Sequence, residues 1–290
     1  MRVAICDGTA VIGQPKYSAC WIYEETAPDW TFRQKLPDPS GRGSEFGAAL
    51  AMTDEWIFVG APEDEEFAFF GGAVHVYRRE PGGMATRTQK LVAPDVLDGP
   101  LFGYALSATD DTLAVGAPLT EAAKGAVHLF KLDGAMWAPA GSLAEDGTFR
   151  LGESVSMSGD TLVSGARGAL HVYRPDGSGA WTPAGRLTPD PFTGAFGFAA
   201  AVATDGRWVV TGAMDETVGG VESSGAAYVF DLECSACRVD LDGDGALTLF
   251  DFLRFFNLFA AGDLAADFDG DGALTLFDFL AFQDEFAAGC

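Results

Sequence analysis

"FGAALAMTDEWIFVGAP", residues Phe46–Pro62, is the stretch that decides the fold, because variants of it recur along most of the chain. The variants are "FGYALSATDDTLAVGAP" from Phe102, "LGESVSMSGDTLVSGAR" from Leu151, "FGFAAAVATDGRWVVTGAM" from Phe196 and, without the Phe-Gly, "VAICDGTAVIGQP" from Val3. Their spacing is roughly 50 residues, which is typical of an internal structural repeat. The chain therefore contains five copies of one unit.

Each unit provides four short strands. The copy itself holds two strands around a turn such as Thr-Asp-Asp or Ser-Gly-Asp, which suits a tight hairpin. A third strand follows, such as "AVHVYR" from Ala73, and then in most copies a Trp-led segment, such as "WTPAGRL" from Trp181. Four-stranded repeats of this length predict a β-propeller. We expect a mainly β domain over residues 1–233, with about five four-stranded blades, one of them incomplete.

The Phe-Gly and Gly-Ala-Pro elements resemble the FG-GAP repeats of integrin-type propellers and of many bacterial surface proteins, over roughly residues 3–233. FG-GAP blades often carry an Asp-rich calcium loop, but the loops from Glu63 and from Met214 lack its D-x-D-x-D-G spacing. Calcium is therefore not expected in the propeller. The first copy has no Phe-Gly and the last has no Trp-led strand, which leaves two explanations open. Either one of five blades is incomplete, or the start is placed too late and a signal peptide and further blades lie upstream.

Three histidines occupy the same place in successive copies: His75, His128 and His171. Trp21 and Tyr228 take this place in the first and last copies. A catalytic histidine is more often singular and paired with a local nucleophile or carboxylate. We therefore predict a structural repeat position, with no catalytic residue and no residue that binds an organic cofactor.

Acidic residues dominate the charge of the chain, with 42 Asp and Glu against 18 Lys and Arg, for a net charge of −24. This excess opposes binding to nucleic acid or to an anionic membrane surface. No apolar run is long enough to span a bilayer, and the first residues predict a strand pair rather than a signal peptide. The acidic run Glu63–Glu66 is expected to be a solvated loop. The aromatic residues that follow it, Phe67, Phe69 and Phe70, leave open that it is an edge that binds a partner.

The C-terminal part carries a near-exact duplication, "DLDGDGALTLFDF" from Asp240 and "DFDGDGALTLFDF" from Asp267. A 12-residue calcium loop supplies oxygen ligands from positions 1, 3, 5, 7, 9 and 12 and has Gly at position 6. Both copies fit, so we predict two calcium ions, whose binding is coupled to folding because it offsets the repulsion between clustered carboxylates. The predicted ligands are Asp240, Asp242, Asp244, Ala246, Thr248 and Asp251 in the first loop and Asp267, Asp269, Asp271, Ala273, Thr275 and Asp278 in the second.

Each loop is followed by a predicted helix but lacks an obvious helix before it, and position 12 is Asp rather than Glu. These features, with the closing "AAGC", resemble a dockerin of the Gly-Cys-ended type found in planctomycete-type bacteria. The resemblance implies a small α-helical domain of paired F-hands, here residues 234–290, that docks onto a protein partner, cohesin-like or other. Loop positions 10 and 11, which help to select that partner, are Leu-Phe in both copies. The apolar helix faces either pack on each other or receive another protein.

Together these features favour a non-enzymatic binding or adhesion protein that is extracellular or surface-associated. Its propeller loops bind an unidentified ligand, and its C-terminal module docks in a calcium-dependent manner. A disulfide between Cys237 and Cys290 would suit that location. The alternative is a secreted enzyme acting on polysaccharide and carried by the same module. An intracellular calcium sensor is disfavoured, because sensors use a helix on both sides of each loop.

Overall fold

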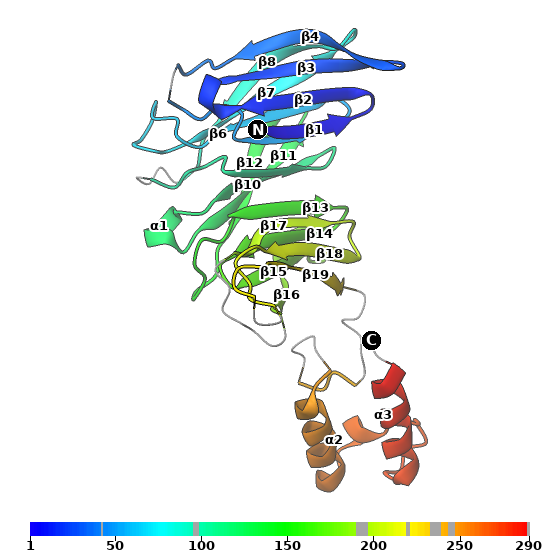
Figure 1. The fold of residues 1–290 in the computed structure, drawn as a ribbon. Helices are drawn as coiled ribbons and strands as arrows, with labels where there is room; N and C mark the ends of the chain where they lie inside the picture. Colours follow the sequence, from blue (N-terminus) through cyan, green and yellow to red (C-terminus); the bar gives the residue numbers. More distant parts are fainter. Residues whose placement is uncertain are drawn as a thin grey trace. The chain divides into compact units, whose positions relative to one another are not determined.

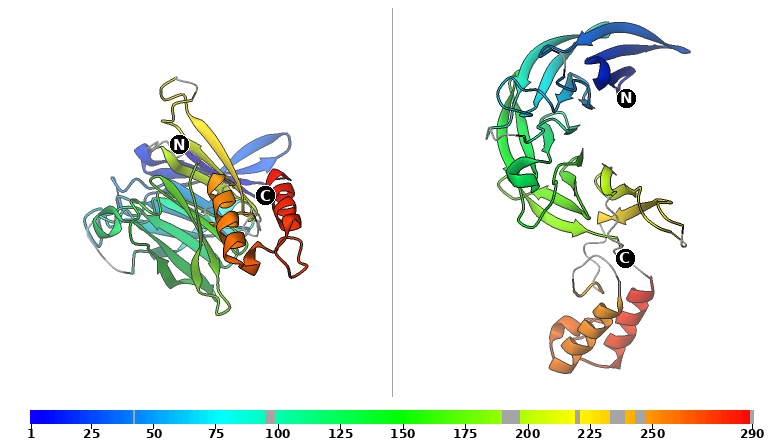
Figure 2. Two further views of the ribbon diagram at one scale, coloured as in Figure 1. Left: turned by 90° about the horizontal axis from the view of Figure 1, so that it is seen from below. Right: turned by 60° about the vertical axis from the view of Figure 1, so that its left-hand side comes forward.

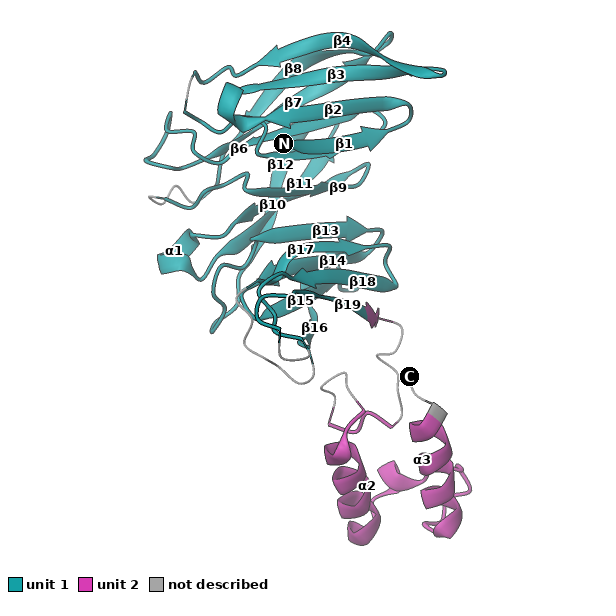
Figure 3. Ribbon diagram, viewed as in Figure 1, with its two compact units in different colours: residues 1–229 teal, residues 230–290 magenta. Residues whose placement is uncertain are grey.

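A computed structural model shows a mainly β protein with two compact units, residues 1–229 and 230–290 (Figures 1 and 3). The structure describes residues 1–41, 43–94, 99–189, 197–218, 221–232, 239–242 and 247–288. The expected domain boundary, between residues 233 and 234, falls among residues outside these ranges. The two units are treated separately below.

Unit 1 contains five antiparallel sheets, and each corresponds to one sequence repeat. Four sheets have four strands in sequential order, and the last sheet has three strands among the described residues. Blade 1 consists of β1 (Arg2–Cys6), β2 (Thr9–Gln14), β3 (Ala19–Thr26) and β4 (Asp29–Pro37). Blade 2 consists of β5 (Ala49–Met52), β6 (Trp56–Ala61), β7 (Ala73–Glu80) and β8 (Met84–Leu91).

The remaining blades repeat this plan. Blade 3 consists of β9 (Ala105–Ala108), β10 (Thr112–Ala117), β11 (Ala126–Asp133) and β12 (Met136–Leu143), with a short turn, α1 (Thr120–Ala123), between β10 and β11. Blade 4 consists of β13 (Ser154–Ser158), β14 (Thr161–Ala166), β15 (Ala169–Pro175) and β16 (Trp181–Leu187). Blade 5 consists of β17 (Phe198–Thr204), β18 (Trp208–Ala213) and β19 (Ala226–Asp231). The predicted mainly β propeller of five blades is confirmed, and blade 5 has three strands within the residues that the structure describes.

Successive blades pack side by side through their inner strands, β1 on β5, β5 on β9, β9 on β13 and β13 on β17. No comparable contact joins β17 to β1 in the described part of unit 1. Figure 2 shows the five sheets as an arc, with blade 1 at one end and blade 5 at the other. The propeller is thus open in this structure.

The core lies between blades, because the second strands and the first halves of the third strands are buried on both faces in blades 2, 3 and 4. In blade 2, Ile57 and Val59 pack towards blade 1, while Phe58 and Val76 pack towards blade 3. Phe58 contacts Trp137 of blade 3, with ring centroids 5.0 Å apart. Alternate residues of one strand therefore belong to two different interfaces, as the two-residue period of a strand requires.

A pair of glycines forms the closest contact between neighbouring blades. A Cβ atom on Gly60, in the second strand of blade 2, would lie only 2.2 Å from the carbonyl oxygen of Gly103, the glycine of the next Phe-Gly. The same contact joins Gly13 to Gly47 and Gly116 to Gly152. The repeated glycines are explained by this backbone approach, which leaves no room for a side chain.

The fifth blade corrects one detail of the predicted repeat. We expected its Phe-Gly at Phe196-Gly197, and Phe196 lies outside the described residues. Phe198-Ala199 occupies the equivalent place instead. The carbonyl oxygen of Ala199 would lie 2.1 Å from a Cβ on Gly165, and Ala199 has the positive φ (68°) of the glycines it replaces. Alanine in this conformation is unusual, because its Cβ crowds the following carbonyl oxygen.

Unit 2 contains the two predicted helices, α2 (Leu249–Ala261) and α3 (Leu276–Ala288), with a 3-10 turn at Leu264–Ala266 before the second loop. Phe255 and Phe282 stack at its centre, with ring centroids 4.4 Å apart and planes at 18°. Phe268 packs edge-on against Phe282. Mutual packing of the helices therefore buries one part of their apolar surface. None of the helices in the described part of the chain could cross a membrane.

Candidate metal centre and propeller sites

Each duplicated loop of unit 2 is fixed to its helix by the aspartate at position 12. Asp278 is fully buried, and its Oδ1 accepts hydrogen bonds from the amides of Phe268 and Asp269 at 2.9 and 3.3 Å. Its Oδ2 accepts from the amide of Thr275 at 2.7 Å. These bonds hold the pKa of Asp278 below its usual value, because they favour the charged form. The carboxylate thus connects the start of the loop to the start of α3.

The first loop repeats this arrangement. Asp251 is buried and accepts from the amides of Leu241, Asp242 and Thr248 at 2.8, 3.3 and 2.8 Å. Thr248 is the N-cap of α2, and its hydroxyl accepts from the amide of Phe250, which completes a capping box with Asp251. The duplication in sequence is therefore a duplication of the hydrogen bonds that join the start of the loop to the start of the helix.

Both loops bring three carboxylates together. Ligand oxygens of Asp240, Asp242 and Asp251 lie within 4.8 Å of one another in the first loop. In the second loop, ligand oxygens of Asp267, Asp269 and Asp271 lie within the same distance of one another. Clustered carboxylates that offer only oxygen are the donors that a hard cation such as calcium prefers.

The second loop is already shaped by its own hydrogen bonds. The two oxygens of Asp267 accept from the amides of Gly270 and Gly272 at 2.8 and 2.9 Å. The amide of Asp271 donates to Asp269, which favours its charged form, but desolvation and the carboxylates of Asp271, Asp278 and Asp267 raise the pKa of Asp269 overall. The loop therefore carries a repulsion between carboxylates that a cation, if bound, would relieve.

Several predicted ligands have other roles here or lie outside the described ranges. Asp244 and Ala246 are among the residues that the structure does not describe. Thr248 and Thr275 cap their helices, each accepting from an amide two residues later at 3.1 Å. Asp278 is not in the carboxylate group of the second loop, whereas Asp251 is in that of the first. The sequence template misses this anchoring role of position 12, for which the Thr-x-x-Asp of a capping box is the available signal.

Pairs of exposed apolar residues lie at equivalent positions of the two helices. Leu249 and Leu276 are the first residues of α2 and α3, and Phe250 and Phe277 follow them. All four side chains are about two-thirds exposed. They are the residues at loop positions 10 and 11, so the core of unit 2 leaves them uncovered.

In unit 1, Glu65 and Glu66 of the acidic run Glu63–Glu66 are exposed, as expected of a solvated loop, but Asp64 is not. Asp64 is buried, and Lys90 of β8 donates to it at 2.9 Å and to Glu66 at 2.5 Å. The burial of Asp64 was not expected, because Lys90, on another strand, lies close by only in the folded state. Phe67 and Phe69 of this loop remain exposed.

The three repeated histidines are buried, two of them beside a Phe-Gly phenylalanine, while the third, His171, pairs with Glu145 at 3.0 Å. Phe46 packs on His75 and Phe102 on His128, with ring centroids 5.4 and 5.5 Å apart. Phe198 packs on Tyr228 in the same way, at 5.6 Å. In blades 2, 3 and 5, the repeat position is therefore one at which two aromatic rings pack together.

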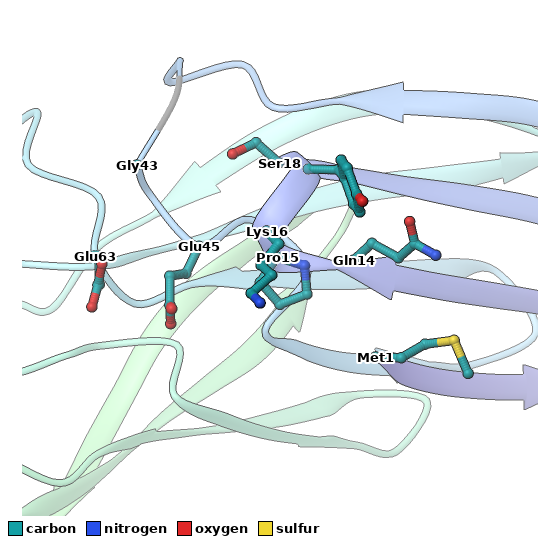
Figure 4. A pocket seen from close by; sticks show the side chains of 9 residues that line it. Met1, Gln14, Pro15, Lys16, Ser18, Gly43, Glu45 and Glu63 are labelled. Carbon is teal, nitrogen blue, oxygen red and sulfur yellow. The ribbon is translucent and has the colours of Figure 1, made fainter.

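A pocket of about 950 Å³ lies where the loops of blades 1 and 2 meet (Figure 4). Its lining residues are Met1, Gln14, Pro15, Lys16, Tyr17, Ser18, Gly43, Glu45 and Glu63. Figure 4 shows the carboxylates of Glu45 and Glu63 near each other. Burial and the charges of Glu45 and Glu65 raise the pKa of Glu63. The pocket therefore offers carboxylates, a lysine and an exposed tyrosine to a polar ligand.

The comparison with protein families agrees with the repeat pattern. Residues 85–130 match the FG-GAP repeat family. The match runs from β8 of blade 2 through β11 of blade 3, so it includes one complete Phe-Gly to Gly-Ala-Pro segment. No curated protein matches the chain.

Solved structures match the fold. One is a protein from Bacteroides uniformis whose name proposes a 6-phosphogluconolactonase activity, with a TM-score of 0.55 and 10% identity, covering 77% of this chain and 63% of that one. Another is a protein from Lactobacillus plantarum, with a TM-score of 0.50 and 14% identity, covering 79% of this chain and 66% of that one. This chain thus matches less than two-thirds of either structure. At these identities the likeness shows the fold alone.

Proposed function

We propose that this is a non-enzymatic binding or adhesion protein, extracellular or surface-associated, with a C-terminal module that docks onto a protein partner when calcium is bound. The observation that carries the proposal is the duplicated loop of unit 2, in which a carboxylate group stands next to an exposed Leu-Phe pair. Calcium held by the loop oxygens would supply positive charge that fixes each loop and, through Asp251 or Asp278, the start of the adjoining helix. The Leu-Phe pairs would then be presented in a defined geometry to a partner, cohesin-like or other.

The propeller is proposed to bind the second ligand. Its loops carry the pocket around Glu45 and Glu63 and the exposed aromatics Phe67 and Phe69. Exposed aromatics and polar groups beside a concave surface favour recognition of a polar surface such as a polysaccharide or a glycosylated protein.

One observation favours an enzyme acting on polysaccharide as the second candidate. Two carboxylates line the same pocket, and the raised pKa of Glu63 is a property of a general acid in glycoside hydrolysis. We favour the binding protein, because the unit-2 duplication supports docking independently of what the propeller does.

Calcium titration calorimetry on the full chain tests the proposal. We expect two bound ions, because the two loops are equivalent in sequence, and one ion in each of Asp240→Ala and Asp267→Ala. Asp176→Ala, which removes an aspartate from a propeller turn, is the matched control and should still bind two ions. Binding of no calcium by the parent chain would remove the physical basis for regulated docking.

A further inference from the structure

The two ends of the arc of blades expose apolar surfaces that are buried everywhere else in unit 1. Each blade has a leading face, which is turned towards the preceding blade in the sequence, and a trailing face, which is turned towards the following blade. At each of the four internal junctions, the trailing face of one blade packs on the leading face of the next. The trailing face of blade 5 and the leading face of blade 1, at the two ends of the arc, do not pack on another described blade (Figure 2). They are the two halves of one more junction of the same kind.

The trailing face of blade 5 is formed by the outward residues of β18 and β19. Val209, Thr211 and Ala213 are buried against blade 4, so the alternate residues of β18 point away from it. Val210 and Val229 are 45% and 62% exposed. Their equivalents in blade 2, Phe58 and Val76, are fully buried under blade 3.

The glycine of blade 5 that is equivalent to the contact glycines of the other blades also indicates that the trailing face of blade 5 is uncovered. A Cβ on Gly60, Gly116 or Gly165 would collide with the backbone of the following blade. A Cβ on Gly212, the equivalent residue of blade 5, would meet no atom of the described residues within 4 Å. The close-packing surface is therefore present in blade 5, and no described segment of the chain packs against it.

The leading face of blade 1 is formed by the complementary alternation in β1, β2 and β3. Val11, Cys20 and Ile22 pack against blade 2. Residues of the opposite face pair across the strands, Val3 with Ile12, Ile12 with Trp21 and Ile5 with Ala10. Val3 and Ile5 are more than half exposed.

We propose that a second copy of this chain occupies these faces, with the trailing face of blade 5 in one copy packing on the leading face of blade 1 in the other. The occupant is a second copy because one chain carries both halves of the junction, and the same pairing of faces already holds its own blades together four times. The contact is head-to-tail, so it joins two different surfaces rather than one surface to itself.

Light scattering coupled to size exclusion, over a series of protein concentrations, tests the proposal with single variants of each face. The unaltered chain should form assemblies larger than one chain as concentration rises. Val229→Asp and Ile5→Asp place a charge in the trailing and the leading face, and each alone should give single chains. Val221→Asp is the matched control, since Val221 is as exposed as Val229 (62%) but lies in the β18–β19 loop, and it should assemble like the parent.

An equimolar mixture of the Val229→Asp and Ile5→Asp chains gives the decisive result. Each variant keeps the one face that the other has lost, so a head-to-tail contact predicts one intact junction and therefore a complex of two chains. Single chains in the mixture, or single chains of the parent at every concentration because the ring closes on itself or binds another occupant, would overturn the proposal. Loss of assembly in Val221→Asp would indicate unspecific association and would overturn it as well.

Discussion

His75 shows how a residue that resembles a functional group is held in an uncharged, structural state. Its ring lies in β7, packs on Phe46 and is fully buried. Burial, with the charges of Arg87 and Lys90, lowers the pKa of His75 to about 4, although the carboxylates of Asp64 and Glu66 act in the opposite direction. The neutral ring is therefore a stable part of the core near neutral pH.

This environment predicts a pH dependence of stability. The pKa of His75 is lower in the folded state than the usual value of about 6.5, so the unfolded chain binds more protons between these two values. The contribution of His75 is complete above about pH 6.5 and is lost as the pH falls towards 4. We expect it to remove about 2 kcal/mol of the free energy of unfolding between pH 7 and pH 5.

Urea unfolding at the two pH values, for the parent and for His75→Phe, measures this contribution. Phenylalanine keeps an aromatic ring beside Phe46 but cannot be protonated. The variant should therefore lose less stability than the parent on going from pH 7 to pH 5, whatever its stability at pH 7. An equal loss in both proteins would show that carboxylates, and not His75, carry the pH dependence.

At the scale of the elements, the junction between two blades depends on the glycine contact. Gly103 has a φ of 91°, and a Cβ there would lie 2.5 Å from the carbonyl oxygen of Ala73. Gly82, in the hairpin between β7 and β8, has a similar φ of 84° but open space around it. Alanine substitutions at these two glycines therefore distinguish the free-energy cost of the backbone conformation from that of the collision with the neighbouring blade.

Two single variants, Gly82→Ala and Gly103→Ala, test the junction. Gly82→Ala should lose about 1 kcal/mol of unfolding free energy, since alanine is strained at positive φ. Gly103→Ala should lose about 3 kcal/mol, because the collision adds to the same strain. Denaturant unfolding followed by tryptophan fluorescence compares the two variants. Equal losses would mean that the blades shift apart without cost at this contact.

The elements also show what the sequence predicts and where it is insufficient. Strands and helices follow from the repeats and from alternating apolar residues, and the histidine position follows from its recurrence. The motif of blade 5 was misplaced because a Phe-Gly pair stands at Phe196, although spacing shows the correct position. Ala61 lies 15 positions after Phe46, and Ala213 lies 15 positions after Phe198. The burial of Asp64 was not predictable, because its partner Lys90 approaches only through the folding of β8.

At the scale of the whole molecule, the two units carry different spectroscopic signals. All six tryptophans, Trp21, Trp30, Trp56, Trp137, Trp181 and Trp208, belong to unit 1. The two long helices, α2 and α3, belong to unit 2. The state of each unit can therefore be followed in the intact chain without cutting it.

Removal of calcium should act on one unit only. Each loop of unit 2 collects three carboxylates, whose repulsion a bound ion would offset, and the position-12 aspartates connect the loops to the helix starts. With a chelator, we expect the helical circular dichroism signal at 222 nm to fall and tryptophan fluorescence to stay unchanged. Added calcium should restore the helical signal, and magnesium, which demands a stricter geometry, should restore it less. A constant signal at 222 nm would mean that the loops fold without an ion, and a change in fluorescence would place a calcium site in the propeller.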